Sequence, residues 1–372
     1  MQIAPPVTTP TDLLAGVLRG DPAWAGVDRY DTHVLVAAAD HHGVGPLVWQ
    51  ALHARRARPH GLYEALAAAR HVDLTHEMLR GREIGRVCAA LDGCGVQALL
   101  VKGAALAYSL YQEPWLRPRV DTDILVAHES LGAANRVLRG LGYHAAPAMT
   151  TGEFVSHQVA YEHHDTHGLS HVIDLHWKTV NPQALADALP FELLWAEAGH
   201  VRHQAVQARV PSHSCSLLLA CVHRLGHHQL QERLVWLYDL HLLANALDES
   251  GWDRLVSIAR QRSISAVCRH GLESATVRLG TAVPARVLAT LRTSGREEPS
   301  RAYTERTQRR IDVLRADLRL LPRWRDRLQL VSEHAFPPAS YMMARYDARK
   351  RLLLPALYVH RLASGAWKWL SA

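Results

Sequence analysis

Two aspartates, Asp121 and Asp123, stand directly before a short apolar run at residues 124–126. Residues two apart on a strand point to the same face, so both carboxylates should project together, about 6.5 to 7 Å apart along the strand. A lone Asp-x-Asp beside a strand is usually a solvated turn. Here the apolar run follows at once, and two like charges against a core strand are unfavourable unless a cation binds them. The pattern therefore favours a divalent-metal site at the start of a buried strand.

A third acidic residue, Asp174, lies inside another predicted strand. Residues 156–161 and 171–177 both alternate enough to form strands, and the polar segment HHDTHG between them indicates a hairpin. Asp174 stands between an isoleucine and a leucine and shares a strand face with His176. An aspartate that faces inward on a central strand is rare unless it is paired or binds metal. Asp174 is therefore predicted to complete a carboxylate cage, as in sites that hold two metal ions about 3.5–4 Å apart.

A strand-to-helix turn precedes these acidic residues. Residues 98–101 form a short apolar run that ends at Lys102 and Gly103, and residues 104–110 have the composition of a helix. Glycine lets the backbone approach a ligand closely, and the free N–H groups of a helix start favour phosphate. Most such turns bind nothing, so the turn indicates a phosphate site only in combination with the aspartates, with Lys102 adding a positive charge.

The order KGAA, RPRVDTDILV and VIDLHW resembles the nucleotidyltransferase superfamily that includes DNA polymerase beta. More narrowly, the chain resembles a largely uncharacterised bacterial family of nucleotidyltransferase-like proteins. That family has a lysine-glycine helix start, an arginine-proline before an Asp-x-Asp, and a later Asp-Leu-His-Trp. The matching residues here are Lys102, Gly103, Arg117, Pro118, Asp121, Asp123, Asp174, His176 and Trp177. The resemblance continues through a helical half that contains LACVHRLGHH and RLVWLYDLHLLA.

The resemblance implies an α+β fold: a small mixed β-sheet with helices, flanked by N-terminal and C-terminal helical regions. It implies transfer of a nucleoside monophosphate from an NTP to an acceptor, with release of pyrophosphate. Asp121, Asp123 and Asp174 would hold two Mg²⁺ or Mn²⁺ ions, and Asp174 would help to deprotonate the acceptor. The residues implied to contact the nucleotide, or to orient its ligands, are Lys102, Gly103, Ala104, Arg117 and His176. A serine often follows the glycine in the superfamily, and the alanine at position 104 removes that hydroxyl contact.

The acceptor stays open at this stage. A small molecule, a peptide or protein, and an RNA end all fit the resemblance. A second class of function is a non-catalytic nucleotide-binding or regulatory module that retains the fold. The complete set of aspartates favours the enzyme over the module.

We expect four regions along the chain: an N-terminal helical segment, the αβ nucleotidyltransferase core, a helical domain and a basic helical region. Their expected limits are 1–79, 80–211, 212–292 and 293–372. Helices are predicted at residues 12–18, 33–41, 61–79, 80–91, 129–141, 252–279 and 284–291, with a helical pair at 212–247 and a polar linker at 293–305.

Composition narrows the setting of the protein. With 372 residues, 48% of them hydrophobic, the chain can bury a sizeable core. Its five cysteines form no close pair, which fits reduced thiols in a cytoplasm. The first ten residues lack the pattern of a signal peptide, and no stretch approaches the roughly 18 apolar residues of a membrane span.

The positive charge is concentrated at one end. Residues 301–372 contain 15 lysines and arginines against 6 acidic residues, whereas the other residues carry a net charge of −2. This region could bind an anionic partner such as RNA, or an anionic membrane through Trp367 and Trp369. The solvated faces of amphipathic helices are the favoured interpretation. The leucines expected on their inner faces are Leu314, Leu318, Leu321, Leu352, Leu353 and Leu357.

Several histidines and one helical aspartate allow further interpretations, either as ligand-binding residues or as structural ones. His223 and His227 have the spacing of zinc-binding helices but lack the glutamate of a HExxH hydrolase. The hairpin histidines could contact a substrate or bind zinc, although a polar loop is the commoner outcome. They are His163, His164, His167 and His171. Asp239 could cap a histidine such as His223 or line the cleft opposite the aspartates.

Overall fold

The computed structural model describes residues 9–21, 30–57, 59, 61–147, 154–228, 232–304, 310–348 and 350–371. Within this part of the chain, seven strands form one mixed sheet in the order β3-β4-β5-β2-β1-β7-β6. The strands are β1 Ala98–Leu100, β2 Thr122–Val126, β3 His144–Ala145, β4 Gln158–His164, β5 Ser170–His176, β6 Gly199–His203 and β7 Val206–Val210. Strand β2 is parallel to β5 and antiparallel to β1, so the predicted mixed sheet and α+β class are confirmed.

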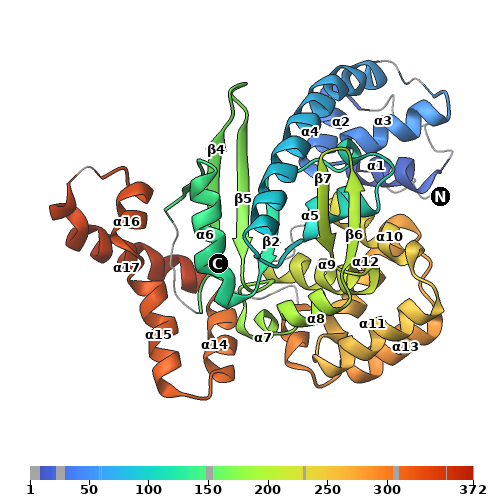
Figure 1. Cartoon of the computed structure of the whole chain (residues 1–372). Coiled ribbons are helices and arrows are strands. Elements are labelled where there is room, and N and C mark those ends of the chain that lie inside the picture. Colours follow the sequence, from blue (N-terminus) through green and yellow to red (C-terminus); the bar gives the residue numbers. More distant parts are fainter. Residues whose placement is uncertain are drawn as a thin grey trace.

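Adjacent residues of the central strands pack into two different hydrophobic cores, one on each face of the sheet. Leu99 and Leu125 belong to a core shared with the helical half of the chain, whereas Leu100 and Ile124 belong to a second core. This alternation follows from the two-residue period of a strand. Because Asp123 lies two residues before Leu125, its side chain is on the sheet face that the helical half covers. Figure 1 shows helices on both sides of the sheet.

The N-terminal helices are longer and more numerous than the sequence suggests. They are α1 Pro10–Arg19, α2 Thr32–His42, α3 Gly45–Ala54 and α4 Leu62–Gly93. Helix α3 was not predicted, and α4 joins the two helices expected at 61–79 and 80–91. The proposed limit between residues 79 and 80 therefore falls inside one continuous helix. The second half of α4 packs on the sheet through Ile84, Val87 and Leu91.

The core helices lie between and beside the strands. They are α5 Lys102–Ser109, η2 Pro114–Leu116, η3 His128–Ser130, α6 Leu131–Gly140, α7 Gln183–Ala186 and α8 Phe191–Ala196. The helical half follows as α9 His213–His228, α10 Leu234–Ala246, α11 Glu249–Gln261, α12 Ser265–Leu279 and α13 Ala285–Ser294. The single helix expected at 252–279 is interrupted, because Ser263 takes a left-handed backbone conformation with a φ of 55°.

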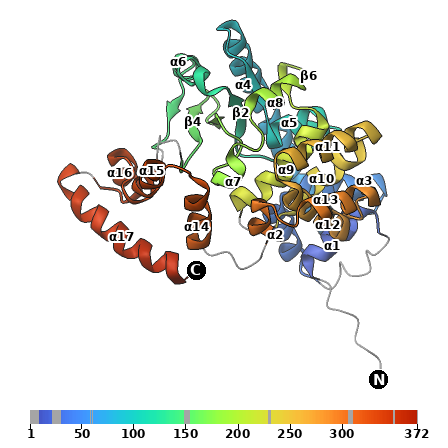
Figure 2. The ribbon, with the colours of Figure 1, turned by 90° about the horizontal axis from the view of Figure 1, so that it is seen from below.

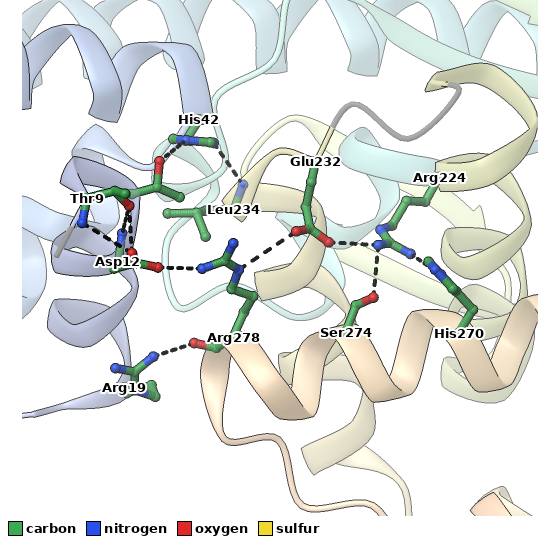
Figure 3. Close-up of polar contacts among 11 residues, drawn as sticks. Thr9, Asp12, Arg19, His42, Arg224, Glu232, Leu234, His270, Ser274 and Arg278 are labelled. Carbon is green, nitrogen blue, oxygen red and sulfur yellow. Dashed lines mark hydrogen bonds and ion pairs between the residues drawn. The ribbon is translucent and has the colours of Figure 1, made fainter. Parts of the chain in front are cut away.

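A chain of charged groups attaches α1 to the helical half (Figure 3). Arg278 on α12 pairs with Asp12 on α1 and lies 3.8 Å from Glu232. Glu232 in turn accepts a 2.7 Å hydrogen bond from Arg224 on α9, whose guanidinium also bonds His270. These residues are far apart in the sequence, so the network ties the N-terminal helix to the helices that cover the sheet.

The C-terminal region forms an arm at the edge of the molecule (Figures 1 and 2). Its elements are α14 Arg310–Leu320, α15 Trp324–Ala335, α16 Ala339–Arg345, η5 Arg351–Leu353 and α17 Leu354–Ser371, and η4 Pro299–Thr304 precedes it and packs on α12. The segment expected as a linker thus contains η4 and the end of α13. In the described part of the chain, no helix combines the length and the apolar character that crossing a bilayer requires.

The leucines predicted to face inward on this arm divide into two groups. Leu321 is buried and Leu314, Leu318 and Leu357 are half-buried, as expected for amphipathic helices. Leu352 and Leu353 are exposed instead, so that part of the prediction is wrong. The side chains of Trp367 and Trp369 lie outside the described residues.

Candidate functional site

The parallel register of β2 and β5 brings two of the predicted acids together. Asp123 is paired with Asp174, and Leu125 is paired with His176. Residues paired in this way share a face of the sheet, and His176 shares that face because it follows Asp174 by two positions. A carboxylate oxygen from each aspartate and a ring nitrogen of His176 all lie within 4.8 Å of one another. Residues 53 positions apart in the chain thus meet in one cluster.

Lys102 places its ammonium group inside this cluster. Its Nζ is 2.8 Å from Asp123 Oδ1 and 3.3 Å from His176 Nε2, and that ring nitrogen is itself 2.8 Å from the same carboxylate oxygen. Lys102 is the first residue of α5 and has a φ of 53°. The left-handed conformation at the strand-to-helix turn therefore belongs to Lys102 rather than to Gly103.

Gly103 lies beside Arg117 at the start of α5, where even a side chain with a Cβ would make only ordinary van der Waals contacts. A Cβ atom at position 103 would lie 3.4 Å from Arg117 Nη2. The guanidinium of Arg117 donates to both carboxylate oxygens of Asp239, at 2.8 and 3.1 Å from Nε and 2.8 Å from Nη2. Tyr111 donates a 2.7 Å hydrogen bond to the same carboxylate. All three side chains are buried, so Arg117 and Asp239 join the core to α10.

This pairing revises two sequence interpretations. Arg117, expected to neutralise phosphate charge, binds Asp239 through its Nε and Nη2 groups and donates from Nη1 to the carbonyl oxygen of Pro118 at 2.8 Å. Asp239, expected to cap a histidine or to face the acids across a cleft, accepts from an arginine and a tyrosine.

Asp121 occupies a different position from the other two acids. It precedes β2, is half-buried, and is not part of the cluster whose ligand atoms lie within 4.8 Å. Burial, followed by the negative charge of Asp123, raises the pKa of Asp121. The structure therefore places His176, rather than Asp121, beside the paired Asp123 and Asp174.

The electrostatic surroundings shift the pKa values of Asp123 and Asp174 in opposite directions. Burial alone would raise the pKa of Asp123, but the charge of Lys102 and the hydrogen bond with His176 hold it far below its usual range. Burial, reinforced by Asp123 and Asp121, raises the pKa of Asp174 to about 6. Gln158 donates a 2.8 Å hydrogen bond to Asp174 Oδ2 and fixes the direction of that carboxylate. Burial, and then the charge of Lys102, lowers the pKa of His176.

The start of α5 offers backbone donors rather than side chains. No side chain caps this helix, and its N-cap residue is Val101. Ala104 is fully buried in the core on the other face of the sheet. A ligand at this turn would therefore meet backbone N–H groups, and the methyl group of Ala104 would not contact it.

A second basic group near Asp121 was not predicted from the sequence. Arg119 donates to Glu77 at 2.9 Å and to the Tyr108 hydroxyl at 2.8 Å. Arg80 lies 3.9 Å from Glu77, and burial together with Arg119 lowers its pKa, whereas Asp121 opposes that change. The one sequence signal for this group is the second arginine of RPRVD, because Glu77 and Arg80 come from a distant helix.

The other histidines form no comparable cluster in the described residues. His171 lies 3.0 Å from Asp165, and His164 lies 3.4 Å from Glu162, which fits a polar hairpin. Among the described residues, Asp123, Asp174 and His176 form a group of three close metal ligands, and the hairpin contains no such group. The side chain of His227 lies outside the described residues, so the spacing of His223 and His227 stays a prediction.

Comparison with known proteins identifies the family. A family model described as an uncharacterised nucleotidyltransferase matches residues 28–280. A search of curated proteins found no match. A solution structure of the antibiotic-resistance factor ANT(2'')-Ia is 14% identical, with 51% of this chain and 94% of that chain covered and a TM-score of 0.36. An antigenic nucleotidyltransferase-like protein from Paracoccidioides brasiliensis is 10% identical, with 56% and 96% covered and a TM-score of 0.34.

The family match spans most of the chain and contains the whole site. It includes the turn at Lys102, the acidic residues of β2 and β5, and the helix that carries Asp239. The chain therefore belongs to the family of uncharacterised nucleotidyltransferases and is a transferase of that class.

Proposed function

We propose that this transferase moves a nucleoside monophosphate from an NTP to an acceptor in a reaction that depends on divalent metal. The family supplies the reaction class. The metal dependence and the roles of individual residues are inferred from the charge balance at the sheet. The acceptor is a small molecule, a peptide or protein, or an RNA end.

The observation that carries the proposal is an excess of negative charge in a buried place. Asp121, Asp123 and Asp174 bring three carboxylates to one region, and Lys102 brings one ammonium group. This group has a net charge of −2 when every member is ionised. The adjacent Arg80, Arg119 and Glu77 add one positive charge, so an acidic excess remains. Unpaired buried charge is unfavourable, and divalent cations relieve it.

The donor set fits Mg²⁺ or Mn²⁺. Carboxylate oxygens are the ligands that both ions prefer, and Asp123 and Asp174 present theirs on one face of the sheet. Asp121 stands at the start of β2, where it could hold a second ion together with phosphate oxygens. His176 orients Asp123 by its 2.8 Å contact. Metal bound at these ligands supplies Lewis-acid stabilisation of charge on the phosphoryl oxygens.

The residues of the chain then have distinct tasks. The N–H groups at the start of α5 bind phosphate, and Lys102 neutralises charge on the triphosphate. Asp174, whose carboxylate direction is fixed by the hydrogen bond from Gln158, is the proposed general base. It takes the proton of the acceptor hydroxyl as that oxygen bonds to the α-phosphorus. The bond from the α-phosphorus to the bridging oxygen breaks, and pyrophosphate leaves.

Label transfer tests this proposal. Purified protein is incubated with labelled NTPs, Mg²⁺ or Mn²⁺, and panels of the three acceptor classes. We expect transfer that requires metal and is lost in Asp121→Asn, Asp123→Asn and Asp174→Asn. The exposed Asp92→Asn serves as the matched control and should leave transfer unchanged.

A direct measurement of Mn²⁺ binding separates two kinds of failure. Binding that disappears in Asp123→Asn but persists in Asp92→Asn supports the metal site even before an acceptor is known. Nucleotide binding that ignores metal and gives no turnover would instead identify a non-catalytic nucleotide-binding or regulatory module.

A further inference from the structure

Helix α17 and the short η5 before it turn an apolar face toward solvent. Leu352, Val359 and Leu362 are 90%, 67% and 44% exposed. Pro355, Ala356 and Ala363 are exposed as well, and at 100° per residue all six fall on one side of the helix. The opposite side, which includes Leu354, Leu357 and Arg361, is half-buried. The solvent-facing side of this helix is therefore apolar, whereas the outer side of an ordinary surface helix is polar.

Helix α15 of the same arm shows a second outward apolar row. Trp324, Leu328 and Val331 follow the spacing of one helix face, and all are exposed. Leu330, on the opposite side, is buried. The inner face of α15 thus packs against the rest of the protein, and the outer row leaves further apolar surface exposed to solvent.

Basic side chains border both apolar faces. Arg323, Arg325 and Arg327 are exposed at the start of α15, and Lys350 and Arg351 are exposed just before α17. The whole segment 301–372 contains 15 basic residues against 6 acidic ones. The partner that covers these faces must therefore be apolar in part and negatively charged in part.

Three kinds of partner can be compared against this requirement. A second copy of the chain would bring two strongly positive arms together, which like-charge repulsion opposes. An RNA strand would match the arginines but would leave the aliphatic row of Leu352, Val359 and Leu362 without apolar contacts. An anionic lipid surface satisfies both, because amphipathic helices insert an apolar face among acyl chains while basic groups meet the headgroups.

We propose that the C-terminal arm binds the surface of an anionic lipid bilayer, with the apolar face of η5 and α17 inserted at the interface. The arm is anchored to the catalytic core beside the site. Asp317 of α14 accepts a 2.9 Å hydrogen bond from the backbone of Gln183, and Glu333 of α15 accepts from the backbone of Phe154 and Val155. Gln183 follows β5, the strand that carries Asp174. Phe154 and Val155 precede β4, the strand that begins with Gln158. Bilayer binding would thus hold the transferase site at the lipid surface.

Vesicle flotation of the full chain tests this binding. The probes are vesicles of phosphatidylglycerol mixed with phosphatidylcholine, and vesicles of phosphatidylcholine alone. We expect flotation with the anionic vesicles, weaker flotation with the neutral ones, and a decrease as salt is raised. Val359→Glu should reduce affinity for the anionic vesicles about tenfold, since it replaces buried apolar surface with a negative charge.

The body of the protein provides a matched control. Val277 on α12 is 79% exposed, and Val277→Glu should leave vesicle binding unchanged. Because both valines are exposed, neither substitution disturbs a core, and circular dichroism checks this. Equal flotation of Val359→Glu and the natural chain would overturn the proposal. So would tight binding of a single-stranded polynucleotide that excludes vesicles, or a dimer in solution that Val359→Glu dissociates. None of these outcomes depends on whether nucleotide transfer is detected.

Discussion

Two buried aspartates, Asp123 and Asp239, are each bound to a cation, yet their surroundings differ. Asp239 is matched by Arg117 and Tyr111, whose donors satisfy both of its oxygens. Asp123 is matched by Lys102 but stands beside Asp174 and near Asp121, so its surroundings keep an acidic excess. Both aspartates are buried, and each is paired with a basic side chain. The unbalanced charge at Asp123 is the basis of the proposed metal site, whereas the balanced pair at Asp239 links the core to the helices.

The strongest test of this contrast removes the charge of Asp123. Asp123→Asn should lower the transfer rate about a thousandfold, because metal stabilisation of the transferring phosphoryl group contributes several kcal/mol. The measurement is label transfer at saturating metal and NTP. The variant relieves part of the acidic excess but also removes the carboxylate paired with the buried Lys102, so some loss of thermal stability is expected and transfer is compared at a temperature where both proteins are folded. A variant that unfolds instead, with transfer proportional to the folded fraction, would make Asp123 as structural as Asp239.

The converse experiment removes Asp239. Asp239→Ala leaves the Arg117 guanidinium buried without its carboxylate, so unfolding in urea should show a loss of about 3 kcal/mol or more. The matched control is Asp253→Ala, which breaks an exposed pair with Arg286 and should change stability by about 0.5 kcal/mol or less. Replacing both Arg117 and Asp239 with leucine should be milder than Asp239→Ala alone. A loss in Asp239→Ala no larger than in the control would show that the buried pair is not a structural link.

Much of the central sheet could be predicted from the sequence. The apolar runs at β1 and β2 and the alternation at β4 and β5 identified four strands within a few residues of their bounds. Strand β6 was not predicted because GHVRH contains one large apolar residue, and β7 was not predicted because VQARV alternates over only five residues. Helix α3 escaped because GPLVWQALHA begins at a glycine and a proline, which indicate a turn as readily as a helix.

The sequence predicts those parts of the site whose positions follow from local sequence patterns. Asp123 and Asp174 lie on strands that local patterns predict, an apolar run for β2 and alternation for β5. The pairing of Arg117 with Asp239 joins residues 122 positions apart, and no local pattern links them. The left-handed conformation of Lys102 could not be predicted either, because it also depends on contacts with residues distant in the sequence. Surrounding packing selects it against the intrinsic preference of a residue with a side chain.

A third buried aspartate, Asp317, sharpens the contrast because it has hydrogen-bond donors but no cation among its described partners. It accepts from Gln183 N at 2.9 Å and from the Tyr303 hydroxyl at 3.1 Å. Burial outweighs these bonds and raises its pKa to about 6. A folded-state pKa above the unfolded value means that stability falls as pH rises toward and through about 6. Asp317→Asn keeps an oxygen acceptor, so its stability advantage should grow by about 1 kcal/mol between about pH 5 and pH 8.

Urea unfolding at the two pH values measures this effect, with Asp92→Asn as the exposed control. The natural chain should lose stability relative to Asp317→Asn as pH rises, whereas Asp92→Asn should track the natural chain. An advantage that shrinks with rising pH would mean that the carboxylate of Asp317 is stabilised by charge, as Asp123 is.

The smallest expected effect belongs to the tyrosine of the balanced pair. Tyr111→Phe removes one hydrogen bond to Asp239 and leaves the bidentate contact with Arg117 in place. Burial, and then Asp239, raises the pKa of Tyr111, so the phenol stays protonated and donates at every accessible pH. The variant should lose about 1 kcal/mol in urea unfolding, with no dependence on pH. A loss as large as that of Asp239→Ala would mean that the tyrosine, rather than the arginine, holds the carboxylate. In that case Arg117 would be available for phosphate, and the division between a structural and a catalytic aspartate would have to be redrawn.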